Sequence, residues 1–100
     1  WTAVTDAASW SPRMWFSAVA YRDRLWVLGG WNRVDGNFGD VWHSADGSHW
    51  TRLHADVIWS KRHEHSAYVF NDRIWLAGGH AEPLNSEVWS LHVPLNFPDA

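Results

Sequence analysis

The sequence predicts an all-β fold in which one antiparallel, four-stranded unit occurs twice. The segment Asp23–Gly30 reads DRLWVLGG, an apolar run of strand length that ends in two glycines. The pattern returns 49 residues later as DRIWLAGG at Asp72–Gly79. Tryptophans recur with the same spacing or with one of 47 residues, which favours a role in core packing: Trp1 and Trp50, Trp10 and Trp59, Trp26 and Trp75, and Trp42 and Trp89.

Each copy divides into short strands separated by turn residues. The strand Leu25–Leu28 and its counterpart Ile74–Ala77 are apolar on both alternating faces, which is typical of a strand covered on either side. The glycines that follow permit a positive φ or a close backbone approach. A period near 50 residues indicates a propeller or a related array of sheets. The remaining strands are expected at Phe16–Tyr21, Asp40–Ser44 and Trp50–His54 in the first copy, and at His65–Phe70 and Glu87–His92 in the second.

The composition narrows the classes of partner. Eight Lys and Arg residues against eleven Asp and Glu residues give a net charge of −3, so the basic surface that nucleic acid requires is not expected. No apolar run approaches the roughly 18 residues of a membrane-spanning helix, so no membrane partner is expected. The sequence contains no cysteine, which excludes disulfides and zinc sites with cysteine ligands.

These features resemble kelch repeats. The resemblance implies a fragment of a kelch-type β-propeller with two four-stranded antiparallel blades, one over residues 13–54 and the other over residues 62–92. The residues that carry it are Arg13, Ser17, Gly29, Gly30, Trp42 and Trp50 in the first copy, and Arg62, Ser66, Gly78, Gly79 and Trp89 in the second. We expect structural roles for the four glycines and for Trp1, Trp26, Trp42, Trp50, Trp75 and Trp89, with Trp26 and Trp75 deeply buried.

The outer strands predict how such blades are completed. Residues Trp1–Val4 read as an outer strand that precedes the first blade, whereas no outer strand follows the second blade. Two blades alone leave an open strand edge and uncovered apolar faces. We therefore expect a closed ring of several copies, in which Trp1–Val4 of one chain completes the second blade of the next. A homotrimer with six blades is preferred and a homotetramer with eight is the runner-up. The alternative is an engineered or excised piece of a longer propeller that has no ligand.

Two arginines, Arg13 and Arg62, lie just before the first strand of each copy. In kelch adaptors that recruit acidic peptides, an arginine at this position points into the mouth of the central channel. The resemblance thus implies a ring of partly exposed guanidinium groups suited to carboxylate or sulfate. The alternative is that each arginine is buried and binds blades together through backbone carbonyls.

Five further residues are candidates for ligand binding. Trp15 and Trp31 break the repeat, since the second copy has Glu and His80 at those positions. Loops carry ligand contacts in propellers, and aromatic rings stack on sugars and on peptide side chains. His63 and His65 place two imidazoles on one side of a strand, where a solvated or channel-lining pair is expected, because a metal site needs further ligands.

The expected function is non-catalytic. The sequence offers no nucleophile–base pair, phosphate loop or paired-carboxylate site. We expect a binding or scaffold module that self-assembles and binds an anion or acidic peptide at the channel mouth. The main alternative is a part of a carbohydrate-active propeller that handles sialic acid, with a glycan as the ligand. No cofactor or metal is expected, since the copper chemistry of some kelch enzymes needs a cysteine cross-linked to tyrosine.

Overall fold

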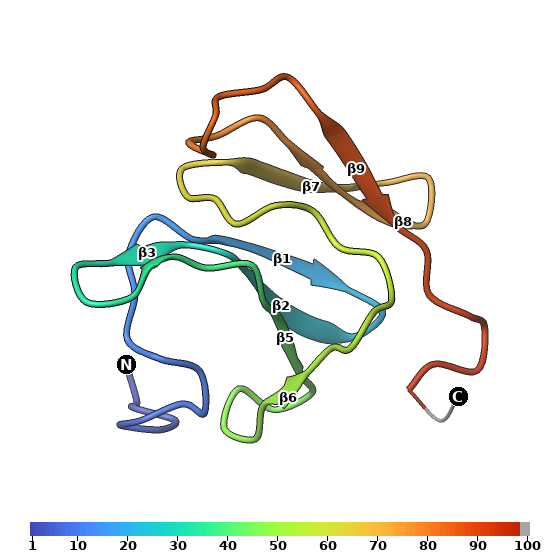
Figure 1. The fold of residues 1–100 in the computed structure, drawn as a ribbon. Coiled ribbons are helices and arrows are strands. Elements are labelled where there is room, and N and C mark those ends of the chain that lie inside the picture. Colours follow the sequence, from blue (N-terminus) through green and yellow to red (C-terminus); the bar gives the residue numbers. More distant parts are fainter. Residues whose placement is uncertain (99–100) are drawn as a thin grey trace.

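A computed structural model of the chain describes residues 1–98 and has an all-β architecture with antiparallel pairing in every sheet (Figure 1). The described residues contain no helix that could cross a membrane. The first sheet has the strand order β1-β2-β5-β6, the second has the order β7-β8-β9, and β3 and β4 form a separate hairpin. The strands are β1 (Ser17–Tyr21), β2 (Arg24–Leu28), β3 (Trp31–Asn32), β4 (Gly36–Asn37), β5 (Val41–Ser44), β6 (Thr51–Arg52), β7 (Ser66–Phe70), β8 (Arg73–Ala77) and β9 (Val88–Leu91).

The two sheets repeat the same local geometry. Two-residue turns at Arg22–Asp23 and Asn71–Asp72 close the first hairpin of each sheet, and all four turn residues have φ between 52° and 56°. Such paired positive φ values match the right-handed twist of the flanking strands. The same positions then face each other in both hairpins: Val19 lies opposite Trp26, and Tyr68 lies opposite Trp75.

The double glycines are required by both backbone conformation and space. Gly30 has a φ of 114°, and a Cβ there would lie 2.9 Å from Cβ of Phe16 and 3.0 Å from the carbonyl oxygen of Met14. Gly79 has a φ of 86°, and a Cβ there would lie 2.6 Å from Cβ of His65. A side chain at either position would therefore displace the residues that precede β1 and β7. Both expected reasons for glycine, positive φ and close approach, are confirmed.

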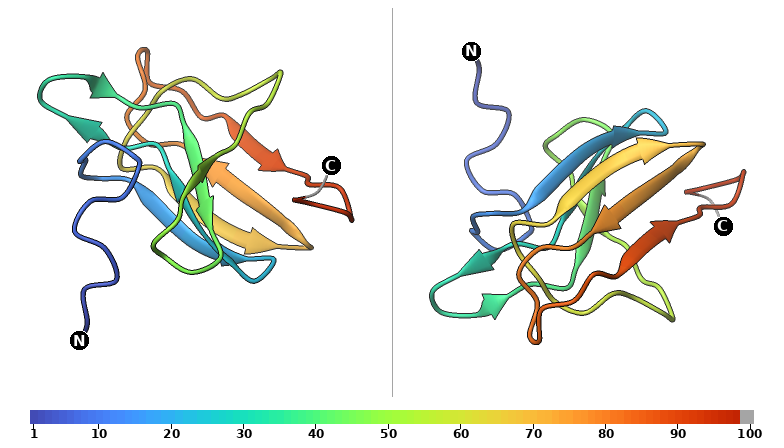
Figure 2. Two further views of the ribbon diagram at one scale, coloured as in Figure 1. Left: turned by 90° about the horizontal axis from the view of Figure 1, so that it is seen from below. Right: turned by 90° about the horizontal axis from the view of Figure 1, so that it is seen from above.

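The sheets pack against each other around one core, with β1 and β7 side by side (Figures 1 and 2). Trp26 and Leu28 of β2 share this core with Ile74 and Leu76 of β8. Trp59, from the segment that connects the two sheets, belongs to the same cluster and is 8% exposed. Burial of these large apolar side chains supplies the main attraction between the sheets.

Hydrogen bonds from β1 and its turn reinforce this packing. The hydroxyl of Ser17 donates to the carbonyl oxygen of His65 at 2.6 Å, and that of Tyr21 donates to the carbonyl oxygen of Asp72 at 2.8 Å. The guanidinium of Arg22 also pairs with the Asp72 carboxylate at 3.0 Å. One side of the first sheet is thus fixed to the second sheet along the whole length of β1.

Equivalent tryptophans of the two sheets differ in exposure. Trp26 is fully buried, with 0% exposed, as expected, whereas Trp75 is only half-buried. The expectation of deep burial is therefore wrong for Trp75. The second sheet covers the face that carries Trp26, while no part of the described chain covers the corresponding face of the second sheet. Local bonding is the same in both, because each indole donates from Nε1 to a carbonyl oxygen five residues earlier, at 2.8 Å.

The segment Trp1–Val4 forms no strand within the single chain. Trp1 is fully exposed and Val4 is 61% exposed. Within the single chain Trp1 therefore lies outside the core, and its structural role, expected in a strand added to a neighbouring chain, stays a prediction. Trp50, its counterpart, is half-buried and donates from Nε1 to the carbonyl oxygen of Gly47 at 2.9 Å.

Replacement of Trp26 should be more damaging than replacement of Trp75. Trp26→Ala leaves a cavity in a filled core, and we expect the free energy of unfolding to fall by about 3–5 kcal/mol. Trp75→Ala removes a half-buried ring, so we expect a loss about half as large in the monomeric chain. Urea denaturation at low protein concentration measures both changes. Equal losses would contradict the uncovered position of Trp75.

Candidate functional site

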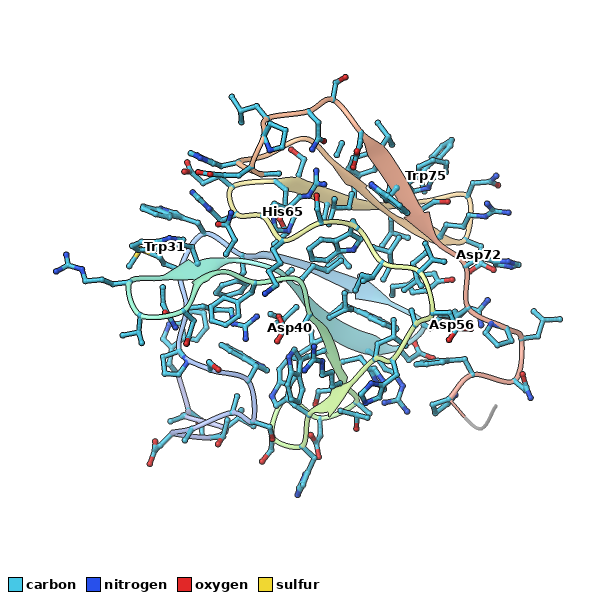
Figure 3. All side chains as sticks on the ribbon, viewed as in Figure 1. Trp31, Asp40, Asp56, His65, Asp72 and Trp75 are labelled. Carbon is cyan, nitrogen blue, oxygen red and sulfur yellow. The ribbon has the colours of Figure 1, made fainter. Side chains whose placement is uncertain are left out.

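The β3–β4 hairpin projects from the first sheet at one end of the molecule (Figure 1). Residues of this hairpin line a pocket. Both halves of the chain contribute to it. Trp31 lies at this end, far from Trp75 (Figure 3). The lining residues are Trp15, Trp31, Gly36 and Asn37 from the first half, and His63, His80 and Glu82 from the second.

Aromatic rings form a continuous series along this pocket. The ring centroids of Trp15 and Trp31 lie 5.3 Å apart, and Trp15 stacks on His63 at 5.1 Å. His63 in turn stacks on His80 at 4.8 Å, with an angle of 20° between the rings. Trp15 remains 48% exposed, so part of its indole is open to a ligand. These four residues, all expected to bind ligand, are therefore brought together by the fold.

The backbone around the pocket is tightly held. Met14 and Trp31 exchange two hydrogen bonds at 2.8 and 2.9 Å, and His63 and His80 exchange two at 2.8 and 3.3 Å. Trp15 and the equivalent residue in the second half, Glu64, have φ of 59° and 55°. A positive φ is strained for a residue as bulky as tryptophan, and such strain persists only where the surrounding structure imposes it. The aromatic series is thus preorganised.

Polar groups border the aromatic series. Asn37 joins the hairpin to the second half, because its amide nitrogen donates to the carbonyl oxygen of His80 at 3.3 Å and its Oδ1 contacts Nδ1 of His63. Oε1 of Glu64 lies 3.5 Å from Nε2 of His63, and Oε1 of Glu82 lies 3.8 Å from Nε2 of His80. Within the described part of the chain, no Lys or Arg lines the pocket. The pocket therefore offers hydrogen-bonding groups without a cation for an anionic ligand.

Arg13 lies outside this pocket and is buried. Its side chain is 1% exposed, and its guanidinium donates to both carboxylate oxygens of Asp40, at 2.6 and 3.1 Å, and to the carbonyl oxygen of Gly29 at 3.1 Å. Burial alone would raise the pKa of the Asp40 carboxyl, but hydrogen bonds from Arg13 and the Trp42 indole lower it below its usual value. The pair therefore stabilises the fold above the ordinary carboxyl pKa and loses this effect as pH falls below it.

Arg62 repeats the arrangement in the second half. Its side chain is 0% exposed and donates to the carbonyl oxygen of Gly78 at 2.9 Å and to the Glu87 carboxylate at 3.3 Å. The expectation that Arg13 and Arg62 are partly exposed at a channel mouth is therefore wrong. Each guanidinium instead binds the loop that follows the central strand of its own half. The role is structural, as the alternative expected, but these bonds do not join one blade to the other. Their donors are used inside the protein, so a ring of free guanidinium groups is not present in the described chain.

His65 is not part of the pocket. It is 6% exposed and lies between the two sheets (Figure 3), so the expected solvated pair with His63, which is 8% exposed, is wrong. Close contact with the double glycines leaves water little access to His65, and within the described chain neither of its ring nitrogens has a hydrogen-bond partner. Among the described residues, no three His, Asp or Glu side chains gather as metal ligands.

Some lining residues were not expected from the sequence. Gly36, Asn37 and Glu82 reach the pocket only because the β3–β4 hairpin and the loop after β8 fold over it. The two-residue strands of this hairpin are too short to show an alternating pattern of apolar and polar residues in the sequence. The turn residues Asp35–Gly36, which precede Asn37, were the one available signal.

The two buried arginines should differ in their contribution to stability. Arg13→Met leaves the Asp40 carboxylate, 11% exposed, without its partner, and we expect a loss of about 3–5 kcal/mol. Arg62→Met frees Glu87, whose side chain is 49% exposed and can be hydrated, so we expect a loss of about 2 kcal/mol. Guanidinium chloride denaturation at pH 7 measures both. Wild-type stability in either variant would contradict the structural role of these arginines.

His65 should make the fold sensitive to mild acid. Burial lowers the pKa of His65 to about 4, whereas an unfolded histidine titrates near 6.5. The unfolded chain therefore binds a proton between these values and the folded chain does not, so stability is full above about pH 6.5 and falls by about 2 kcal/mol as pH drops toward 4.

The variant His65→Phe carries the residue that the first half of the chain has at the equivalent position, Phe16. It should lose most of the pH dependence of the free energy of unfolding. A smaller dependence of the same sign should remain, because burial and the nearby Arg24 also lower the pKa of His43. Urea denaturation of wild type and variant at pH 7.5 and 4.5 measures the difference. An unchanged pH dependence in His65→Phe would contradict the neutral, buried state of His65.

No family model matches the chain, and no curated protein sequence matches it.

Proposed function

We propose that the chain is a non-catalytic binding module, a two-blade portion of a kelch-type propeller, and that it binds a glycan in the pocket of Trp15, Trp31, His63 and His80. One observation carries this proposal. Three of the positions at which the two halves differ, those of Trp15, Trp31 and His63, converge on a single pocket. Positions that the halves share, such as Arg13 and the double glycine, build the frame.

The chemistry of the pocket favours a neutral sugar over an acidic peptide. A pyranose ring has an apolar C–H face that can stack on an indole, and hydroxyl groups at its rim that can donate to carboxylates. Trp15 and Trp31 supply the aromatic surface, while Glu64, Glu82 and Asn37 supply hydrogen-bonding groups beside it. An aromatic surface with a few placed polar groups is typical of a ligand site. Carboxylates at the rim repel a sialic acid or a glutamate side chain, which argues against both anionic alternatives.

A glycan array that contains both neutral and sialylated oligosaccharides tests this proposal. We expect binding to neutral glycans and none to the sialylated ones or to a poly-glutamate peptide. For the tightest neutral glycan, Trp31→Ala should lower the affinity at least about tenfold in calorimetric titration, because the stacked ring is lost.

Leu95→Ala is the control, since this side chain is 92% exposed and lies outside the pocket. It should leave both the affinity and the fold unchanged. Equal affinity in wild type and Trp31→Ala would overturn the glycan site, and chemical conversion of a bound oligosaccharide would overturn the non-catalytic assignment.

A further inference from the structure

The second sheet has one apolar face that is uncovered within the described chain. We call it the trailing face; its large side chains are Tyr68, Phe70, Trp75 and Val88. Tyr68 is 44% exposed, Phe70 is 66% exposed and Val88 is 58% exposed, and Trp75 is half-buried among them. The strand register places these side chains on one side, because Tyr68 pairs with Trp75 and Ala77 pairs with Val88. Contiguous exposed apolar side chains of this size indicate an interaction surface.

The equivalent face of the first sheet shows what this surface packs against. Its residues are Val19, Tyr21, Trp26 and Val41, at the same positions of the repeat. Tyr21 is 6% exposed, Trp26 is 0% exposed and Val41 is 3% exposed, because the second sheet covers them. Phe70 and Trp75 of the trailing face correspond to Tyr21 and Trp26, so both pairs are aromatic. Val88 corresponds to Val41, so this pair is identical. The trailing face therefore matches a surface that this protein already buries.

The covering surface is also present in the chain. The second sheet covers Trp26 with Ile74, Leu76 and Trp89, of which Ile74 is 1% exposed and Leu76 is 2% exposed. The repeat-equivalent residues of the first sheet are Leu25, Val27 and Trp42, which we call the leading face. Leu25 is 50% exposed, compared with 1% for its counterpart. Val27 is 4% exposed and Trp42 is half-buried, so each chain carries a free trailing face and a leading face that is open at Leu25.

A third match lies at the strand edges. In the first sheet, β6 completes the edge of β5, with Trp42 opposite Arg52 and His43 opposite Thr51. The second sheet has three strands, and β9 is an edge without a further partner among the described residues. Suppose that Trp1–Val4 pairs with β9 in the same register that β6 has on β5. The repeat then places Ala3 opposite Trp89 and Thr2 opposite Ser90. Within one chain Trp1–Val4 forms no strand, so this segment is free to pair with a neighbour.

We propose that the trailing face of one chain binds the leading face of a second copy, with Trp1–Val4 of the second copy added to β9 of the first. The contact joins two different surfaces, so it repeats head to tail. It closes into a ring because it repeats the rotation between neighbouring blades of a propeller. Three copies supply six sheets, which is the expected closure, and four copies supply eight. This inference concerns surfaces remote from the aromatic pocket and stands independently of the proposed glycan site.

Light scattering after size-exclusion chromatography measures the mass of the particle. We expect three times the chain mass of 11.6 kDa, with four times as the other closed form. Val88→Asp places a charge in the trailing face and should raise the dissociation constant at least about tenfold, giving single chains at micromolar concentration. Val34→Asp is the matched control, because Val34 is 91% exposed in the loop between β3 and β4 and lies on neither face.

Mixing two blocked variants tests the head-to-tail geometry. Leu25→Asp blocks the leading face, so it and Val88→Asp should each be monomeric. Each retains the face that the other lacks, and an equimolar mixture should therefore form a dimer and nothing larger. Circular dichroism of each variant shows that it is folded. A mixture that stays monomeric, or a single variant that forms dimers, would overturn the head-to-tail contact.

A disulfide tests the strand register without a destabilising charge. The chain has no cysteine, so Thr2→Cys combined with Ser90→Cys introduces one new pair. Under mild oxidation we expect disulfide-linked multimers of two and three chains, because directly opposite residues of antiparallel strands lie within disulfide reach. Thr2→Cys combined with Val34→Cys is the control and should form none. A wild-type particle of one chain's mass at every concentration, with no cross-linking of the Thr2 and Ser90 pair, would overturn the proposal.

Discussion

A buried guanidinium in each half of the chain fixes the loop on which the rest of that half depends. Arg13 and Arg62 each bind the carbonyl oxygen of the first glycine after the central strand and the carboxylate that precedes the next strand. The strand that leaves the sheet and the strand that returns to it are thereby held together. A charge buried in this way is stable only with every partner in place, which explains why both halves carry the same residue types at these points.

The pocket depends on this frame but is built from residues that the frame leaves free to vary. His63 directly follows Arg62, and Trp15 lies two residues after Arg13, so the buried arginines position the start of the aromatic series. The equivalent positions in the other half hold different side chains, because nothing in the packing of the sheets requires an indole or an imidazole there. Shared positions therefore carry the architecture, and divergent positions give this end of the molecule its particular chemistry.

Much of the fold was predictable, because its signals are local. The continuous apolar runs around Trp26 and Trp75, and the double glycines after them, correctly indicated the central strands of the two larger sheets and the positive φ values that follow them. The environment of the arginines was not predictable, since it depends on acidic residues 25–27 positions away that only the folded loop brings near. The exposure of Trp75 was missed for a related reason: a strand pattern shows which side chains share a face, but not what covers that face.

Amide hydrogen exchange of β9 tests most directly whether the second sheet repeats the first and is completed from outside the chain. At concentrations where the particle is intact, we expect the amides of Val88–Leu91 to exchange about as slowly as those of Val41–Ser44, because both strands then have partners on two sides. Dilution to single chains should accelerate exchange in β9 and leave β5 unchanged. Fast exchange in β9 at every concentration, with β5 protected, would contradict this view of the molecule.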